Sequence, residues 1–134
     1  MEFTNFEFPD SVVPNYRSVI PLEAYGLSWD LHNWGIFRQL SFEPLSGDVV
    51  LEWIVSPDGS DGRPNLETAC RFRFVGVTLL RMGKRDDAYP ASESETVSDI
   101  TIRTDGVTER LLFEFQDERD IEIAARTVTL ERDL

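Results

Sequence analysis

Apolar and polar residues alternate most clearly in the stretch Cys70–Met82, and this pattern predicts the central strand of the protein. Residues 70–74, CRFRF, alternate apolar and basic side chains, which is the period of a strand with one buried and one solvated face. Gly76 interrupts the alternation, and a glycine inside a strand pattern is typical of a bulge or bend. Because a bulge shifts the inward face by one position, we expect Val77 and Leu79 to join the core.

Two apolar rows on either side of Pro44-Leu45-Ser46-Gly47 predict a hairpin over residues 36–55. A four-residue loop pairs Phe42 with Val49, Leu40 with Leu51, Arg38 with Trp53, and Ile36 with Val55. This register keeps the apolar partners on one face, which a slip of one residue would destroy. Since Arg38 falls in the apolar row, we expect its guanidinium group to stack on the indole of Trp53.

A second hairpin is predicted around Asp105-Gly106, a strong turn signal. Two registers keep its apolar faces aligned. Ile100 opposite Leu111 places Asp-Gly at the turn centre, whereas Ile100 opposite Phe113 matches the apolar rows better. We expect the first register.

The last hairpin must align the apolar row 111, 113 and 115 with Ile121 and Ile123. Strand side chains alternate with a period of two, so Phe115 must face an odd-numbered residue and the loop must contain an odd number of residues. We expect a Glu118-Arg119-Asp120 loop, which pairs Gln116 with Glu122, Phe115 with Ile123 and Phe113 with Ala125. A change of phase before Val128 and Leu130 predicts a bulge near residues 124–126.

The register of this hairpin places four acidic residues on its outer face or at its tip. These residues are Glu114, Glu118, Asp120 and Glu122, and they form the predicted acidic ridge. An acidic ridge attracts basic ligands over a distance, so it is the candidate surface for binding a basic partner.

The first 35 residues show no clear period. Phe3, Phe6 and Phe8 form an aromatic arm, which we expect to lie across the core because exposed phenylalanines are unfavourable in water. Residues 21–26, PLEAYG, are the one helix candidate, with proline at the first position and glycine at the end. Polar loops are expected at 56–67 and 83–95.

About seven strands without intervening helices predict an all-β fold, an antiparallel β-sandwich or open barrel. We expect one domain over residues 1–134, in which the irregular arm 1–35 packs on antiparallel strands spanning 36–131. The length of 134 residues suits a single hydrophobic core, and the sequence shows no internal repeat or interdomain linker.

The net charge of −12 changes the range of plausible partners. Nucleic-acid backbones require clustered lysine and arginine, so we expect no nucleic-acid binding. The functional interpretation of the charge is attraction of a basic partner, and the alternative is solubility alone. The longest apolar run is too short for a membrane span, and the acidic start lacks the pattern of a secretory signal, so a cytoplasmic location without membrane binding is predicted.

Few residues are suited to catalysis or metal binding. His32 is the one histidine, and Asp30 would share its face on an extended segment, so the pair could form an alternative site. No nucleophile motif accompanies it, and Cys70 falls on the apolar face of the central strand, so we assign no catalytic residue. One histidine and one cysteine make a poor metal set, and residues 58–62 lack the ligands of a calcium loop. We therefore predict no metal and no cofactor.

One basic segment stands out in an acidic chain: Arg71, Arg73, Arg81, Lys84 and Arg85 fall within residues 68–85, which contain no acid. We expect these residues to pair with acids of neighbouring strands. The alternative is an exposed patch that binds an anion or a partner.

The order of features resembles the small all-β immunity proteins of bacterial polymorphic-toxin systems. The residues that carry the resemblance are Asp30-Leu31-His32, the hairpin 36–55, and the F-x-F-x-G-V sequence at 72–77. The resemblance implies a protein that binds and blocks a cognate toxin without catalysis, and a basic toxin domain would suit the acidic charge.

These observations predict a non-enzymatic protein-binding module. Two alternatives stay open at this point. The first is a small β-barrel enzyme or ligand-binding protein with its site near Asp30 and His32, and the second is a structural subunit of a larger assembly. The oligomeric state is not determined by these patterns.

Overall fold

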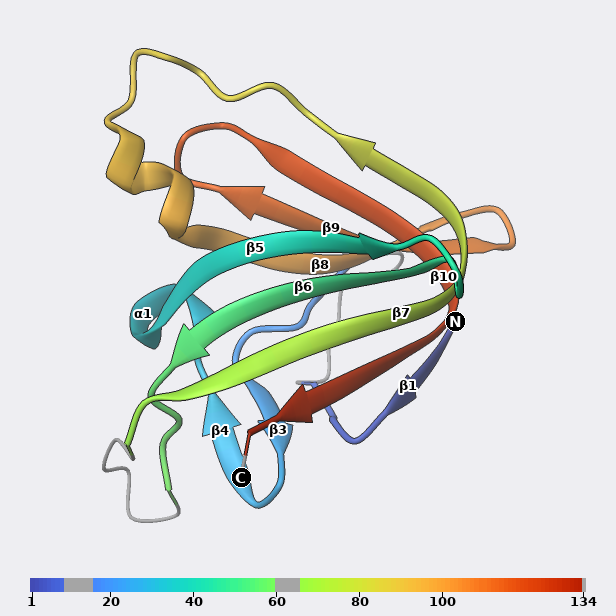
Figure 1. The fold of residues 1–134 in the computed structure, drawn as a ribbon, viewed down its shortest axis with the longest axis horizontal. Coiled ribbons are helices and arrows are strands. Elements are labelled where there is room, and N and C mark those ends of the chain that lie inside the picture. Colours follow the sequence, from blue (N-terminus) through green and yellow to red (C-terminus); the bar gives the residue numbers. More distant parts are fainter. Residues whose placement is uncertain (9–15, 60–65, 134) are drawn as a thin grey trace.

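The computed structural model describes residues 1–8, 16–59 and 66–133, which form mainly β-strands (Figure 1). Seven strands follow one another across a continuous sheet, and each neighbouring pair is antiparallel, which confirms the predicted all-β fold. Their order is β2 (Tyr16–Ser18), β8 (Val97–Asp105), β9 (Thr108–Phe115), β10 (Asp120–Arg132), β7 (Thr68–Met82), β6 (Asp48–Val55) and β5 (Gly35–Glu43).

Short elements complete the described structure. Strand β1 (Glu2–Thr4) adds to the sheet by pairing in parallel with β10, and β3 (Leu22–Ala24) pairs with β4 (Leu27–Trp29) in a separate two-stranded sheet. Helix α1 (Leu31–Trp34) is a single turn, and the 3₁₀ helix η1 (Ala91–Glu95) lies in the connection between β7 and β8.

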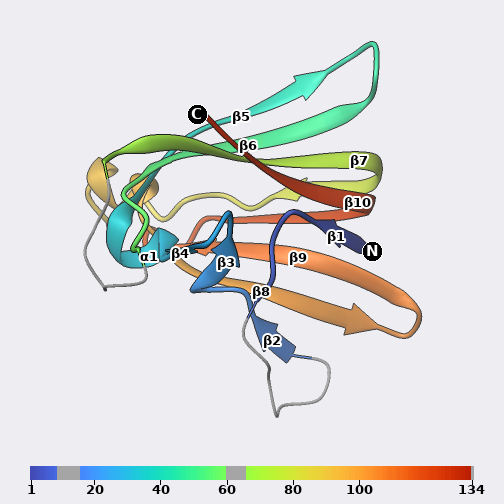
Figure 2. The same cartoon turned by 90° about the horizontal axis from the view of Figure 1, so that it is seen from below.

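The main sheet curves so strongly that β5 and β6 lie over β8 and β9 (Figure 2). Ring contacts cross the interior between these layers. Phe37 of β5 lies 5.0 Å from Phe115 of β9, and Trp53 of β6 lies 5.7 Å from Phe113 of β9, measured between ring centroids. Helix α1 contacts β5, β6 and β8, and its Leu31 is buried in the same core. The curved sheet is consistent with the predicted sandwich or open barrel.

Strand β7 is the long strand that the sequence predicted and it lies inside the sheet between β6 and β10, although β10 holds the middle position. Gly76 has a φ of +69°, and a Cβ there would lie 2.9 Å from the Cβ of Arg126, so both its backbone and its surroundings require glycine. Val77 pairs with Ala125 and packs against the core, as predicted. Leu79 pairs with Ala124, and because adjacent residues on β10 point to opposite faces, Leu79 lies outside the core, contrary to prediction.

The predicted bulge near residues 124–126 is confirmed by a register shift between Ala124 and Ala125. The shift coincides with a change of neighbour along β10. Residues 120–123 pair with β9, whereas residues 127–129 pair with β1. The bulge therefore lets one strand present apolar side chains inward on both halves.

The N-terminal arm packs on the core as expected. Phe6 is buried, its ring lies 5.7 Å from that of Phe72, and Phe3 and Phe8 pack against the same cluster. The helix predicted at residues 21–26 is wrong, because these residues form β3 and the turn that joins it to β4. Tyr25 and Gly26 at the turn centre both have positive φ, which is the geometry of a tight hairpin.

The hairpin formed by β5 and β6 follows the predicted register only near its loop. Phe42 pairs with Val49 and Leu40 with Leu51, as expected. A register shift between Phe37 and Gln39 then leaves Arg38 exposed and pairs Phe37 with Trp53, so the predicted Arg38–Trp53 stacking and Ile36–Val55 pairing are wrong. The shift buries an aromatic ring on the indole in place of a charged group.

In the β8–β9 hairpin Ile100 pairs with Phe113, so the register that we preferred, with Leu111 opposite Ile100, is wrong. The alternative register holds because it pairs Ile102 with Leu111 as well. Gly106 still serves the turn, since it takes a φ of +64° as the first residue of a two-residue loop.

The β9–β10 hairpin confirms the parity argument but not the predicted register. Phe113 pairs with Ile121 and Leu111 with Ile123, so the apolar rows share a face. The loop has three residues, as expected, but they are Gln116-Asp117-Glu118 rather than Glu118-Arg119-Asp120. The predicted pairings of Gln116 with Glu122, Phe115 with Ile123 and Phe113 with Ala125 are therefore wrong.

Candidate functional site

The turn between β9 and β10 is organised around a buried carboxylate, Asp117. The Phe115 amide donates to the Arg119 carbonyl at 2.9 Å, and Glu118 takes a φ of +68°, as in three-residue hairpin loops. The Asp117 side chain is fully buried and accepts hydrogen bonds from Ser94 Oγ at 2.5 Å and from the Arg119 amide at 3.1 Å. This local network explains the register, because it places Asp117 in the turn.

Arg85 Nε reaches the same Asp117 carboxylate at 3.3 Å, so the carboxylate connects the β9–β10 turn to the segment 83–95. Burial alone would raise the pKa of Asp117, but hydrogen bonds from Ser94, the Arg119 amide and Arg85 outweigh it and hold the pKa below its ordinary value. Asp117 therefore remains ionised and fixes the turn, η1 and Arg85 to one another.

Beside this turn the surface has a hollow of about 510 Å³, which we call the acidic hollow. Three residues of the predicted acidic ridge line it: Glu114, Glu118 and Asp120. Ser98, Phe115, Gln116 and Arg119 complete the lining. Glu114 and Asp120 are direct cross-strand partners, so two carboxylate side chains project from opposite positions on the same face of the sheet.

The carboxylates of the acidic hollow are weakly compensated. Glu114 lies 3.5 Å from Arg103 Nη2, and Glu118 accepts from the Tyr89 hydroxyl at 3.4 Å. Within the described residues Asp120 has no ion pair. The guanidinium carbon of Arg119 lies 4.5 Å from the ring centre of Phe115, and Arg119 Nη2 donates to the Ser94 carbonyl.

The fourth predicted ridge residue, Glu122, differs from the other three. It lies on the outer face but does not line the acidic hollow, and its side chain is mostly buried. Arg110 and Arg81 bind its carboxylate at 2.7 Å and 2.9 Å. Two guanidinium groups thus neutralise Glu122, whereas Glu114, Glu118 and Asp120 leave negative charge at the surface.

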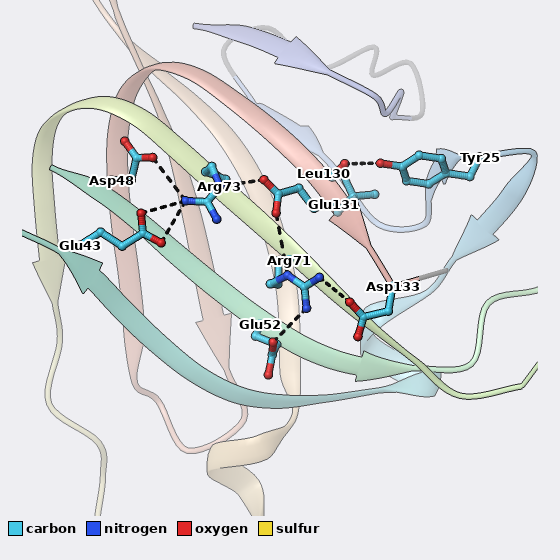
Figure 3. Close-up of polar contacts among 9 residues, drawn as sticks. All are labelled: Tyr25, Glu43, Asp48, Glu52, Arg71, Arg73, Leu130, Glu131 and Asp133. Atoms are coloured by element: carbon cyan, nitrogen blue, oxygen red, sulfur yellow. Dashed lines mark hydrogen bonds and ion pairs between the residues drawn. The ribbon is translucent and has the colours of Figure 1, made fainter. Parts of the chain in front are cut away.

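Four arginines of the basic segment are paired with acids, as the sequence analysis expected. On the outer face of the sheet, Arg71 and Arg73 are held among acids from β5, β6, β10 and the residue that follows β10 (Figure 3). Arg81 binds Glu122, Arg85 binds Asp87 and Asp117, and Lys84 is exposed. The acids around Arg71 and Arg73 are Glu43, Asp48, Glu52, Glu131 and Asp133.

This network on the outer face leaves an excess of acid, because five carboxylates surround two guanidinium groups. Arg73 alone contacts Glu131 at 2.7 Å, Glu43 at 3.0 Å and Asp48 at 3.3 Å. The arginines order the acids across neighbouring strands, and three negative charges remain in excess. Arg71 and Arg73 therefore lie within a network whose net charge is negative.

Asp30 and His32, the alternative site, have structural partners. Asp30 caps α1, and its carboxylate accepts from the backbone amides of His32 at 3.2 Å and Asn33 at 3.1 Å. The His32 ring does not bind that carboxylate, because its Nδ1 lies 2.8 Å from the Val97 carbonyl oxygen. Asp30 therefore caps α1, and His32 joins α1 to β8.

The remaining candidates for chemistry are Cys70 and the 58–62 segment. Cys70 is fully buried, and burial raises the pKa of its thiol to about 12, as expected for an unreactive core cysteine. Residues 60–62 lie outside the described part of the chain. In the described ranges no three His, Cys, Asp or Glu side chains are grouped closely enough to hold a metal ion.

Sequence reasoning missed the role of Asp117, because a turn aspartate normally faces solvent and its buried partners come from a distant segment.

A comparison with protein-family models, curated proteins and solved structures finds no match to the chain. Among the described residues, no helix has the length and apolar character needed to span a membrane.

Proposed function

We propose that this protein is a non-enzymatic binding module that uses the acidic hollow to bind a basic segment of a protein partner. The observation that carries the proposal is the direct cross-strand pairing of Glu114 with Asp120, with Glu118 beside them. Like charges directly opposite each other on a sheet reduce stability, so their presence favours a role in binding over a role in folding.

A basic partner would relieve this repulsion. A lysine or arginine side chain entering the hollow would lie near Glu114, Glu118 and Asp120, and the net charge of −12 would speed its approach. Such binding weakens as salt increases, because exposed charges are screened over ~10 Å in 0.1 M salt. The excess acid around Arg71 and Arg73 adds to the same attraction.

The more specific proposal is an immunity protein that neutralises a basic toxin domain in the bacterial cytoplasm. It is supported by the resemblance in the order of sequence features and by the acidic surface. The enzymatic alternative has less support, because Asp30 and His32 are occupied by backbone partners. Assays against ester, phosphate and glycoside substrates test that alternative, and turnover that is lost in His32→Ala would overturn the binding proposal.

The decisive experiment identifies the partner and then varies the charge of the hollow. Affinity capture from lysate of the source cell, followed by mass spectrometry, supplies a candidate whose affinity is measured by calorimetry at several salt concentrations. Glu118→Lys should weaken binding about tenfold, equivalent to ~1.4 kcal/mol. The matched control is Glu67→Lys, which has the same charge change at an exposed site outside the acidic hollow.

The result separates specific from general charge effects. A large loss for Glu118→Lys with a small loss for Glu67→Lys supports the acidic hollow as the binding site. Equal losses in both variants would reduce the charge effect to general attraction, and the hollow would no longer be the site. A partner without basic character whose affinity does not depend on salt would overturn the proposal as a whole.

A further inference from the structure

A second depression, lined by acidic and aromatic residues, lies on another part of the molecule. It has a volume of about 500 Å³, and we call it the arm groove. One wall is the N-terminal arm with Phe3, Asn5, Phe6 and Glu7. The other wall is the β3–β4 hairpin with Glu23 and Tyr25, and the arm passes beside this hairpin in both views (Figures 1 and 2).

Two glutamates are held opposite each other where the walls meet. The Glu7 amide donates to the Glu23 carbonyl and the Glu23 amide donates to the Glu7 carbonyl, both at 2.7 Å. In such an antiparallel bridge the two side chains project on the same side, a few ångströms apart. Both residues are exposed, and neither forms an ion pair with another described residue.

This arrangement works against the stability of the free protein. The Glu7–Glu23 bridge joins the arm to the hairpin, and a pair of like charges is among the least favourable choices at directly opposed positions. Any uncharged polar residue would satisfy the same backbone hydrogen bonds without the repulsion. The repulsion is instead relieved when a cation lies between the two carboxylates, and this points to a positively charged ligand.

The aromatic lining narrows the type of cation. The rings of Phe3 and Phe6 pack edge to face at 5.5 Å. Tyr25 is held in place, because its hydroxyl donates to the Leu130 carbonyl at 2.5 Å (Figure 3), and its ring already carries the Arg132 guanidinium group, whose carbon lies 4.5 Å from the ring centre. A fixed tyrosine beside two carboxylates suits a planar cation, which can stack on a ring while it donates to oxygen atoms at its edge.

We propose that the arm groove binds the guanidinium group of an arginine side chain presented by the basic protein partner. Arginine fits better than lysine, because its five donors lie in one plane and can serve both glutamates while the face of the group rests on an aromatic ring. The proposal rests on the proposed function only for the source of the arginine, since the groove and its charges are independent of the acidic hollow.

The test uses the isolated protein and a defined probe, the peptide acetyl-Gly-Arg-Gly-amide. Amide signals of the ¹⁵N-labelled chain are followed by NMR during titration. We expect saturable shifts at Asn5, Glu7, Glu23 and Gly26, with an affinity of about 1 mM, as suits one side chain on an open surface. The control peptide carries citrulline, which has the shape of arginine without its charge, and it should cause no saturable shift.

Two variants separate binding from folding. Glu7→Gln and Glu23→Gln should each weaken peptide binding about fivefold, the effect of one exposed ion pair. Each should also unfold at the same or a higher temperature, because the repulsion across the bridge is removed. The matched control, Glu95→Gln, changes an exposed glutamate of η1 that does not line the groove and should leave the peptide affinity unchanged.

Several outcomes would overturn the inference. One is equal binding of the citrulline peptide, and another is unchanged affinity in both groove variants. Tighter binding of spermidine at the same amides would assign the groove to a free polyamine instead of an arginine side chain. If the groove fails these tests while Glu118→Lys still weakens the partner complex, the inference falls and the proposed function stands.

Discussion

Truncation of Phe72 is predicted to be among the most damaging single changes in this fold. Its side chain is fully buried at the centre of the aromatic core, and it contacts rings of the arm and of three strands. The ring centroids of Phe6, Trp53, Phe74 and Phe113 lie between 5.6 and 6.5 Å from that of Phe72. Phe72→Ala therefore removes contacts on several sides at once.

The magnitude follows from the surroundings. Replacing a buried phenylalanine with alanine lowers the free energy of unfolding by ~3–5 kcal/mol, through lost transfer energy and the cavity that remains. Neighbours on separate strands and on the arm are held by their own backbone pairing, so the cavity collapses little, and we expect ~4–5 kcal/mol. That loss is a large part of the ~5–15 kcal/mol by which a domain is stable.

The adjacent residue on β7 provides the matched control. Arg73 points to the outer face, where it pairs with Glu43, Asp48 and Glu131. Since each exposed ion pair contributes ~0–1 kcal/mol, Arg73→Ala should lower the free energy of unfolding by about 1–2 kcal/mol. Urea titration followed by tryptophan fluorescence measures both values, provided that the slope m is unchanged. Equal losses for the two variants would refute the assignment of an inner and an outer face.

A double-mutant cycle tests how the arm is attached. If Phe6 docks on Phe72, Phe6→Leu and Phe72→Leu should be coupled by about 0.5–1.5 kcal/mol, the range for edge-to-face aromatic pairs. Additive effects would mean that the arm does not contact Phe72 in solution.

Three further predictions address the bend, the turn and the core thiol. Gly76→Ala should lower the free energy of unfolding by ~2 kcal/mol or more, because it adds a clash with Arg126 to the strain of a positive φ. Gly106 also has a positive φ but has open space around it, so Gly106→Ala should lower the free energy of unfolding by only ~1 kcal/mol, and chemical denaturation measures both values. Asp117 has a lowered pKa in the folded state, so its contribution to stability should be complete above the unfolded pKa of ~3.9 and should be lost as the pH falls through the folded pKa. In Asp117→Asn the free energy of unfolding should therefore fall less steeply between pH 6 and pH 2 than in the wild type, as measured by denaturant titration at each pH. Cys70, with a pKa of about 12, should resist thiol reagents at pH 8 until the protein unfolds, and rapid labelling of the folded protein would contradict its burial.

Much of the architecture is accessible to sequence reasoning where burial imposes a period of two. The inward residues of β6, the first half of β7 and β9 were predicted because each presents an unbroken apolar row, and those of β10 because its two apolar rows differ by one change of phase. Parity also required an odd loop between β9 and β10, and the loop has three residues. The short β3–β4 hairpin escaped prediction, since its strands have only three residues each and show no period.

The four residues of the predicted acidic ridge do not share one environment in the structure. Glu114, Glu118 and Asp120 gather around one hollow, whereas Glu122 is neutralised by Arg81 and Arg110. The difference depends on which strands become neighbours. Arg81 approaches Glu122 across β7 and β10, and Arg110 approaches it across β9 and β10. The spacing of residues along the chain does not contain this information.

The sequence by itself determined the inner faces of β6, β9, β10 and the first half of β7, the site of the bend at Gly76 and the acidic character of the chain, because these depend on the period and type of nearby residues. Only the tertiary structure decided the registers, the burial of Asp117 and the opposition of Glu7 to Glu23. Several registers satisfy the same local alternation, and the free energy that distinguishes them comes from contacts between residues far apart in the chain. Packing across the curved sheet therefore selected one arrangement among those that the local pattern allowed.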